Sequence, residues 1–144
     1  YCGIGTIGLS LAEQCKELVG VEIVPQAIEN AKINAKINGI ENAEFFCADA
    51  KDAAQKFANE GKTFDVIIVD PPRKGCDQQT LDAIIQMAPP TLVYVSCNPA
   101  TLARDLKILE ENGFATVSAT PVDLFPRTHH CETVALLKWR ETDV

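Results

Sequence analysis

The sequence predicts an α/β fold built on an open, mostly parallel β-sheet with an antiparallel strand at its C-terminal end. Helical patterns alternate with short apolar runs along the 144 residues. Two of these runs, residues 64–70 and 91–96, are almost continuously apolar, as expected for strands covered on both faces. Two β-rich segments lie close together at the C-terminus, which favours an antiparallel pair. At 47% hydrophobic residues, the chain suits one domain with one core.

The first half of the chain is predicted to alternate between helices and strands. The clearest helix begins at Pro25, because proline is tolerated in a first helical turn, and Gly39 provides its stop. Gly61 ends the next helix. The predicted helices cover residues 6–15, 25–39 and 50–61, and the predicted strands cover residues 17–23 and 43–49.

The second half continues the alternation and then ends on two strands. Asp77 and Asn98 stand where helix N-caps are expected, and Pro99 suits a first helical position. Gly113 stops the last helix. The predicted helices cover residues 78–87 and 99–112, and the predicted strands cover residues 64–70, 91–96, 114–125 and 132–139.

Composition narrows the function classes. A formal net charge of −7 argues against this chain gripping a nucleic-acid backbone by itself. No apolar run reaches the roughly eighteen residues of a membrane span. The six cysteines are widely spread without a CxxC pair, so we expect reduced thiols and neither disulfides nor a metal site. The adjacent His129, His130 and Cys131 do not change that expectation.

The chain opens on a glycine-rich turn, YCGIGTIG, that leads into a helix. Gly3, Gly5 and Gly8 have the spacing G-x-G-x-x-G, and Glu22 ends the following strand, where a carboxylate can bind ribose hydroxyls. This pattern fits either NAD or S-adenosylmethionine, and the alternative is a tight turn without a ligand. Asp49, after the next strand, could accept a hydrogen bond from an adenine amino group or act as an ordinary helix N-cap.

Asp70 follows a buried strand in the segment VDPPRKG. Pro71 and Pro72 cannot continue a ladder, so the backbone leaves the sheet at a fixed point. Asp-Pro-Pro at this position resembles methyltransferases that act on bases, which favours S-adenosylmethionine over NAD. In those that methylate amino groups an aromatic residue follows, whereas Arg73 stands here, which weakens an interpretation as amino methylation.

Cys97 lies between a predicted strand and the Asn98–Pro99 helix start. The dipole and free N–H groups of a helix N-terminus favour a thiolate, which is the nucleophilic form of cysteine. A thiolate that adds to carbon 6 of a pyrimidine makes carbon 5 nucleophilic enough to take a methyl group. The alternative is a small buried hydrophobic residue.

The chemistry at carbon 5 also needs a base to remove a proton, close to a flipped-out pyrimidine. The segment DLFPRTHHCETVALL offers His129, His130 and Glu132 as candidates. Glu132 stands where the predicted loop re-enters a strand, and its alternative role is that of an ordinary surface carboxylate at a strand start.

Four segments together, YCGIGTIG, DPPRKG, SCNPATLARDL and DLFPRTHHCET, resemble the S-adenosylmethionine-dependent RNA uracil-5-methyltransferases along the whole chain. The resemblance implies a class I, Rossmann-like methyltransferase fold and is slightly closer to the bacterial 23S rRNA enzymes than to the tRNA enzyme. It implies Cys97 as nucleophile and Glu132 as proton acceptor. The implied cofactor-binding residues are Tyr1, Gly3, Gly5, Thr6, Glu22, Asp49 and Asp70, and the implied substrate-binding residues are Arg73, Phe125, Thr128 and His130.

The same resemblance makes residues 1–144 a catalytic domain truncated at its N-terminal side. The first strand, expected mid-sheet between the strands that end at Glu22 and Asp70, is missing, so these two strands should not pair with each other. Family members carry an RNA-binding domain upstream, and several carry an iron–sulfur cluster there. We therefore expect a cytoplasmic enzyme that holds RNA mainly through that domain, and little activity from this chain alone.

Three other functions share part of the pattern. A cytosine-5-methyltransferase uses the same thiolate chemistry but usually has Pro-Cys where this chain has Asp-Pro-Pro-Arg at residues 70–73. An amino-methyltransferase would use Asp70 and ignore Cys97. A NAD-binding oxidoreductase domain, or a non-catalytic remnant that binds S-adenosylmethionine, would leave the DPPR and SCNP segments without a role.

Overall fold

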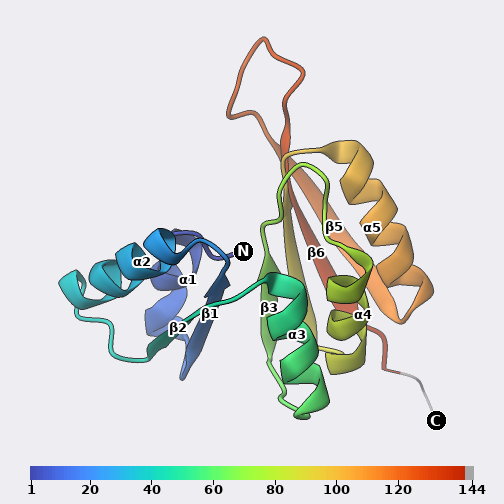
Figure 1. Ribbon diagram of the computed structural model, residues 1–144. Helices are drawn as coiled ribbons and strands as arrows, with labels where there is room; N and C mark the ends of the chain where they lie inside the picture. The colour runs from blue at the N-terminus through green and yellow to red at the C-terminus, as the bar shows by residue number, and fades with distance from the viewer. Residues whose placement is uncertain (142–144) are drawn as a thin grey trace. The chain divides into compact units, whose positions relative to one another are not determined.

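The computed structural model describes residues 1–141 and divides into two compact units, Tyr1–Ala53 and Ala54–Val144 (Figure 1). The described strands form two sheets, one in each unit, and no ladder in residues 1–141 joins the strand before Glu22 to the strand before Asp70. No helix among these residues is long and apolar enough to cross a membrane. All six cysteines are free thiols.

The first unit packs helices against a two-stranded parallel sheet. Its elements are α1 (Thr6–Leu11), the 3-10 helix η1 (Ala12–Gln14), β1 (Leu18–Glu22), α2 (Pro25–Ile37) and β2 (Ala43–Cys47). The strands pair from Leu18 opposite Ala43 to Glu22 opposite Cys47. The helix predicted over residues 6–15 is therefore shorter and tightens into a 3-10 turn. The helix α3 (Ala50–Asn59) begins in this unit and continues into the second.

The core of the first unit depends on one close approach. Ile28, Ala31 and Ala35 of α2 pack on Phe45 of β2. A Cβ atom on Gly20 of β1 would lie 2.5 Å from the Phe45 ring, so only glycine leaves room for the ring. The small residue in β1 thus allows a large one in β2.

The second unit holds a four-stranded sheet in the order β3-β4-β6-β5. Its elements are β3 (Val66–Val69), α4 (Gln78–Met87), β4 (Thr91–Ser96), α5 (Pro99–Glu111), β5 (Phe114–Val122) and β6 (Glu132–Trp139). β3 and β4 are parallel, whereas β6 runs antiparallel to both β4 and β5. The predicted mixed sheet with antiparallel C-terminal strands is therefore confirmed, and four of these six elements match their predicted bounds to within one residue.

The covered face of this sheet carries the core of the second unit. Burial alternates along β4, which places Leu92, Tyr94 and Ser96 on one face. Leu137 of β6 and Phe114 of β5 are also fully buried. The Phe114 ring meets Trp139 edge-on with 5.0 Å between ring centroids.

Phe114→Ala should lower the free energy of unfolding by about 3–5 kcal/mol, because it removes a fully buried aromatic ring and leaves a cavity. Val117→Ala in the same strand is the control: Val117 is 60% exposed and should change stability by less than about 0.5 kcal/mol. Urea denaturation measures both. Equal losses in the two variants would contradict this assignment of the core.

Candidate functional site

The glycine-rich turn lies directly against the end of β1. The terminal amino group of Tyr1 and the backbone N–H of Cys2 both donate to the carbonyl of Val21, at 2.7 and 2.9 Å. Gly3 and Gly5 have φ angles of 53° and 86°, in the left-handed region that favours glycine. Gly5 is buried and immediately precedes α1, so the turn approaches the strand end as closely as its backbone allows.

Glu22 is held by backbone donors on both of its oxygens. Its Oε2 accepts the N–H of Gly3 at 3.0 Å, and its Oε1 accepts those of Ile23 and Val24 at 2.9 and 3.2 Å. Charge-assisted bonds of this kind stabilise an ionised carboxylate. Because a carboxylate offers about four acceptor positions, Oε2 retains room for a further donor such as a ribose hydroxyl.

Asp49 is an N-cap, as one of its two predicted roles required. Its Oδ1 accepts the N–H of Lys51 at 3.1 Å at the start of α3. The preceding residue, Ala48, donates its N–H to the carbonyl of Glu22 at 3.0 Å. Asp49 therefore lies at the same edge of the first unit's sheet as Glu22.

Cys2, in the glycine-rich turn, packs against the core of the first unit and is not among the predicted site residues. Burial raises the pKa of its thiol, and the Glu22 carboxylate contributes in the same direction. This packed position against the core of the first unit suits a structural role for Cys2.

In the second unit, the segment with Asp70 leaves the sheet directly after β3. Pro71 is buried, and the N–H of Gly75 donates to the carbonyl of Pro72 at 2.9 Å, which closes a turn. Burial raises the pKa of the Asp70 carboxyl group above its ordinary value. Arg73, at the tip of this loop, has an exposed side chain.

Strand register places Cys97 and Glu132 at the same end of one ladder. Ser96 of β4 pairs with Thr133 of β6, so Cys97 immediately follows one partner and Glu132 immediately precedes the other. Both side chains are partly buried. The Ser96 hydroxyl accepts the N–H of Asn98 at 3.0 Å and donates to its carbonyl at 2.9 Å, which constrains the backbone on both sides of Cys97. A thiol and a carboxylate 35 positions apart in sequence thus lie at one end of a single ladder.

Asn98 caps α5, as predicted. Its Oδ1 accepts the N–H of Ala100 at 3.0 Å, and its Nδ2 donates to the carbonyl of Arg73 at 3.2 Å. Asp77 also precedes its helix, but its carboxylate accepts the Thr80 hydroxyl at 3.0 Å and no backbone N–H. The predicted cap position is right at both helices, and the side-chain cap bond forms at one.

The remaining predicted residues lie in the loop of residues 123–131, which projects beyond the ends of β5 and β6 (Figure 1). The hydroxyl of Thr128 donates to the carbonyl of Phe125 at 2.7 Å and accepts the N–H of His130 at 3.3 Å. The Phe125 and His130 rings meet edge-on with 6.4 Å between centroids. The loop therefore presents an exposed aromatic ring and an imidazole side by side.

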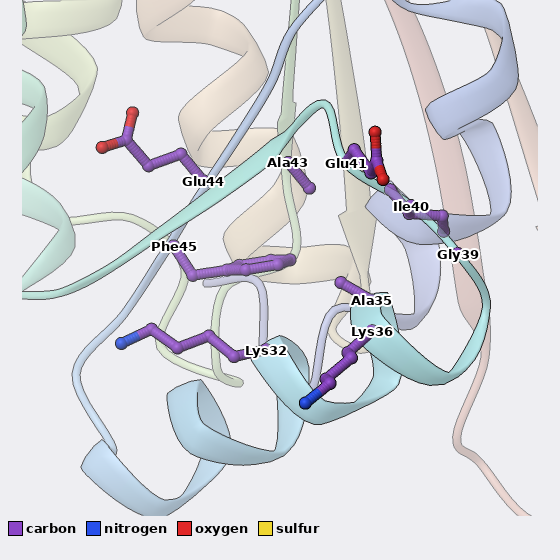
Figure 2. A pocket seen from close by; sticks show the side chains of 9 residues that line it. All are labelled: Lys32, Ala35, Lys36, Gly39, Ile40, Glu41, Ala43, Glu44 and Phe45. Atoms are coloured by element: carbon purple, nitrogen blue, oxygen red, sulfur yellow. The ribbon is translucent and has the colours of Figure 1, made fainter.

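A hollow that is separate from these residues lies on the first unit between α2 and β2. It has a volume of about 560 Å³, and Figure 2 shows its wall of Lys32, Lys36, Glu41, Glu44 and Phe45. It contains none of the predicted site residues. In residues 1–141 no group of three or more His, Cys, Asp or Glu side chains is arranged to hold a metal ion.

The structure thus gathers Tyr1, Gly3 and Glu22 at one strand end of the first unit. In the second unit, Cys97 and Glu132 share an edge, and Asp70 follows the parallel neighbour of β4. The sequence analysis did not select four polar side chains of the second unit that bind the segment after Asp70 or one another: Tyr94, Thr101, Arg104 and Asp105. The signal in the sequence was Asp105, a charged residue at a position of α5 where the helical periodicity calls for an apolar one.

A family model described as tRNA (uracil-5-)-methyltransferase matches residues 1–140. The chain is 56% identical to an uncharacterized RNA methyltransferase of Oceanobacillus iheyensis over 137 residues, which are 95% of this chain and 30% of that protein. It is 53% identical over 138 residues to one of Clostridium acetobutylicum, at 96% and 30% coverage. The chain therefore spans less than a third of the length of these relatives.

Solved structures show the same similarity. The Pyrococcus abyssi tRNA (uracil-54, C5)-methyltransferase in complex with S-adenosyl-L-homocysteine superposes with a TM-score of 0.84 at 38% identity, covering 95% of this chain and 32% of that one. An rRNA methylase from Streptococcus thermophilus reaches a TM-score of 0.74 at 12% identity, covering 98% and 84%, which shows a shared fold.

Asn98→Ala should lower the free energy of unfolding by about 1 kcal/mol, because α5 loses its N-cap acceptor. Asn98→Asp keeps an acceptor and should recover most of that loss, although it cannot donate to Arg73. Urea denaturation of the two variants separates the contributions. If Asn98→Asp were as unstable as Asn98→Ala, the bond to Arg73 and not the cap would carry the effect.

Proposed function

We propose that the protein methylates carbon 5 of a uridine in RNA. The chain belongs to the tRNA (uracil-5-)-methyltransferase family, and the proposal starts from that membership. The observation that carries the proposal is the pairing of Ser96 with Thr133, which brings a thiol and a carboxylate to one sheet edge. Methylation at carbon 5 of a pyrimidine needs both groups, a nucleophile and a base. Methylation of an exocyclic amine needs no thiol.

In this mechanism Cys97 acts first. Its thiolate adds to carbon 6 of the uracil ring, and the electron pair of the 5,6 double bond makes carbon 5 nucleophilic. When bound, S-adenosylmethionine supplies the methyl group that carbon 5 takes. Glu132 then removes the proton from carbon 5, the double bond re-forms, and the bond between sulfur and carbon 6 breaks to release the thiolate.

The residues of the first unit suit the methyl donor. Glu22 has acceptor capacity left for ribose hydroxyls, and the close-lying glycine turn exposes backbone next to it. Tyr1, Gly3, Gly5 and Thr6 would line that turn, and Asp49 would face the adenine end. Asp70, whose carboxyl follows β3, would line the methyl-donor side.

The loop of residues 123–131 suits the binding of the uracil ring. Phe125 and His130 offer an aromatic edge and a hydrogen-bonding ring for a flipped-out uracil, and Thr128 supports both through the loop backbone. Arg73 would contact the substrate from the neighbouring loop. We favour ribosomal over transfer RNA from the SCNPATLARDL and FPRTHHCE segments.

Binding of the RNA would rest mainly on other parts of the protein. The net charge of −7 makes this chain a weak partner for a phosphate backbone. It also covers only 30% of the length of its relatives. Six free thiols suit a reducing compartment such as the cytoplasm.

Substitutions of Cys97 and Glu132 should block two different steps of the reaction. With the intact protein, tritiated S-adenosylmethionine and ribosomal or transfer RNA, the wild type should yield labelled 5-methyluridine. Cys97→Ala should abolish labelling, because no adduct at carbon 6 can form. Glu132→Gln should slow release by about 10²–10⁴-fold and accumulate a methylated protein–RNA adduct that survives denaturing electrophoresis.

Cys131→Ser is the matched control, a nearby partly buried thiol that should be dispensable. Labelled 5-methylcytidine or a methylated amino group in place of 5-methyluridine would overturn the proposed function. Turnover retained in Cys97→Ala but lost in Cys131→Ser would overturn the assignment of the nucleophile.

Glu22→Ala should weaken binding of S-adenosylmethionine by roughly ten- to a hundredfold, because a charge-assisted hydrogen bond to the ligand contributes about 1.5–3 kcal/mol. Calorimetry on the intact protein measures the affinity. Glu44→Ala, at an exposed position in β2, is the control and should bind normally. Normal affinity in Glu22→Ala, or a preference for NAD, would contradict this cofactor site.

A further inference from the structure

The loop that carries Asp70 and Arg73 is held almost entirely by one helix face. Asn98 and Thr101 of α5 donate to the carbonyl of Arg73 at 3.2 and 2.9 Å. One turn further, Nη2 of Arg104 donates to the carbonyls of Lys74 and Cys76 at 2.9 and 3.2 Å. Three side chains spaced three residues apart thus bind the carbonyls of Arg73, Lys74 and Cys76.

Asp105 is the centre of this arrangement and is fully buried. Its Oδ2 accepts the Tyr94 hydroxyl at 2.6 Å and the N–H of Cys76 at 2.9 Å. Its Oδ1 accepts Nε of Arg104 at 2.8 Å. A buried carboxylate is costly unless its oxygens are satisfied, and here each oxygen has a donor from a different part of the unit.

The Tyr94 hydroxyl is a permanent donor in this cluster. Burial raises its pKa, and its hydrogen bond to Asp105 raises the pKa further, so it stays protonated at any pH at which the protein functions. The loop backbone at Gly75 packs closely against Arg104 and Asp105. Gly75 has a φ of 77°, and a Cβ there would lie 2.6 Å from both Arg104 Nη2 and Asp105 Oδ2.

The helix that holds the loop is also the helix that Cys97 precedes. Cys97 lies between Ser96 and the Asn98 cap, and the loop is fastened to the first two turns of the same helix. A shift of residues 73–76 relative to α5 therefore moves Arg73 relative to the Cys97 thiol. Two reacting groups must meet within a fraction of an ångström, and a displacement of about 1 Å can cost about 10²-fold in rate.

We infer that Tyr94, Arg104 and Asp105 are positioning residues, which set the loop of residues 70–76 against Cys97 for methyl transfer. The inference rests on the proposed function. A cluster that served stability alone would affect turnover only through the fraction of folded protein. A positioning cluster lowers kcat in protein that is fully folded.

The test uses two mild substitutions in the intact protein. Arg104→Lys keeps the positive charge beside Asp105 but cannot reach Asp105, Lys74 and Cys76 together. Tyr94→Phe removes one donor to Asp105 and almost no volume. Leu109→Val, at a buried position one turn beyond Asp105 in α5, is the control for lost stability.

Three quantities are measured well below the melting temperature of every variant: kcat for 5-methyluridine formation, KM for S-adenosylmethionine, and amide hydrogen exchange of residues 70–77. In Arg104→Lys and Tyr94→Phe we expect kcat to fall about ten- to a hundredfold, KM to change less than kcat, and loop exchange to accelerate. In Leu109→Val we expect a lower melting temperature with kcat and loop exchange unchanged.

Each other result overturns one claim. A wild-type protein that forms no 5-methyluridine removes the proposed function, and the inference falls with it. An active wild type, with kcat in Arg104→Lys and Tyr94→Phe equal to that of Leu109→Val, removes the positioning role and leaves the function standing. A loss of kcat without faster loop exchange also removes it, because the effect then does not pass through the loop.

Discussion

The antiparallel pairing of β4 with β6 is the constraint on which the second unit depends. This ladder sets Ser96 opposite Thr133 and so brings Cys97 and Glu132 to one end of the sheet. A slip of one residue would turn every side chain of one strand to the other face. The buried faces prevent such a slip, because Leu92, Tyr94 and Leu137 would then leave the core. The packing of the core and the placement of Cys97 and Glu132 at one end of the sheet are therefore consequences of the same register.

Carboxylates serve two different purposes in this molecule, and their hydrogen bonds distinguish them. Glu22 accepts three backbone N–H groups at a strand end and keeps capacity for another donor. Asp105 is fully buried and satisfied by a hydroxyl, a backbone N–H and a guanidinium. The first arrangement suits a ligand contact, and the second suits a fixed joint between a loop and a helix. Asp49 combines features of both, because its Oδ1 caps a helix and its position is beside the strand end of Glu22.

The family motifs gain a physical account from these contacts. In SCNPATLARDL, the asparagine and the proline start α5, while Thr101, Arg104 and Asp105 bind the loop that DPPRKG forms. Gly75 completes that loop because its φ of 77° and its lack of a Cβ let it pass beside Arg104 and Asp105. The two segments therefore form one structural unit, although 25 positions separate Arg73 from Asn98 and each segment reads as an independent motif.

Local patterns in the sequence were enough to predict the alternation of helices and strands and the cap at Asn98, whereas they left Asp49 with two possible roles. These features depend on residues within a few positions of each other, through helix capping, proline and glycine geometry, and apolar periodicity. The motifs also selected Cys97, Glu132 and Glu22 as site residues. Only the tertiary structure decided how they are placed, because the β4–β6 register brings Cys97 and Glu132, 35 positions apart in sequence, to the same end of one ladder. It alone revealed the role of Asp105, since an aspartate inside a helical pattern has no partner until Tyr94 and Cys76 are folded against it.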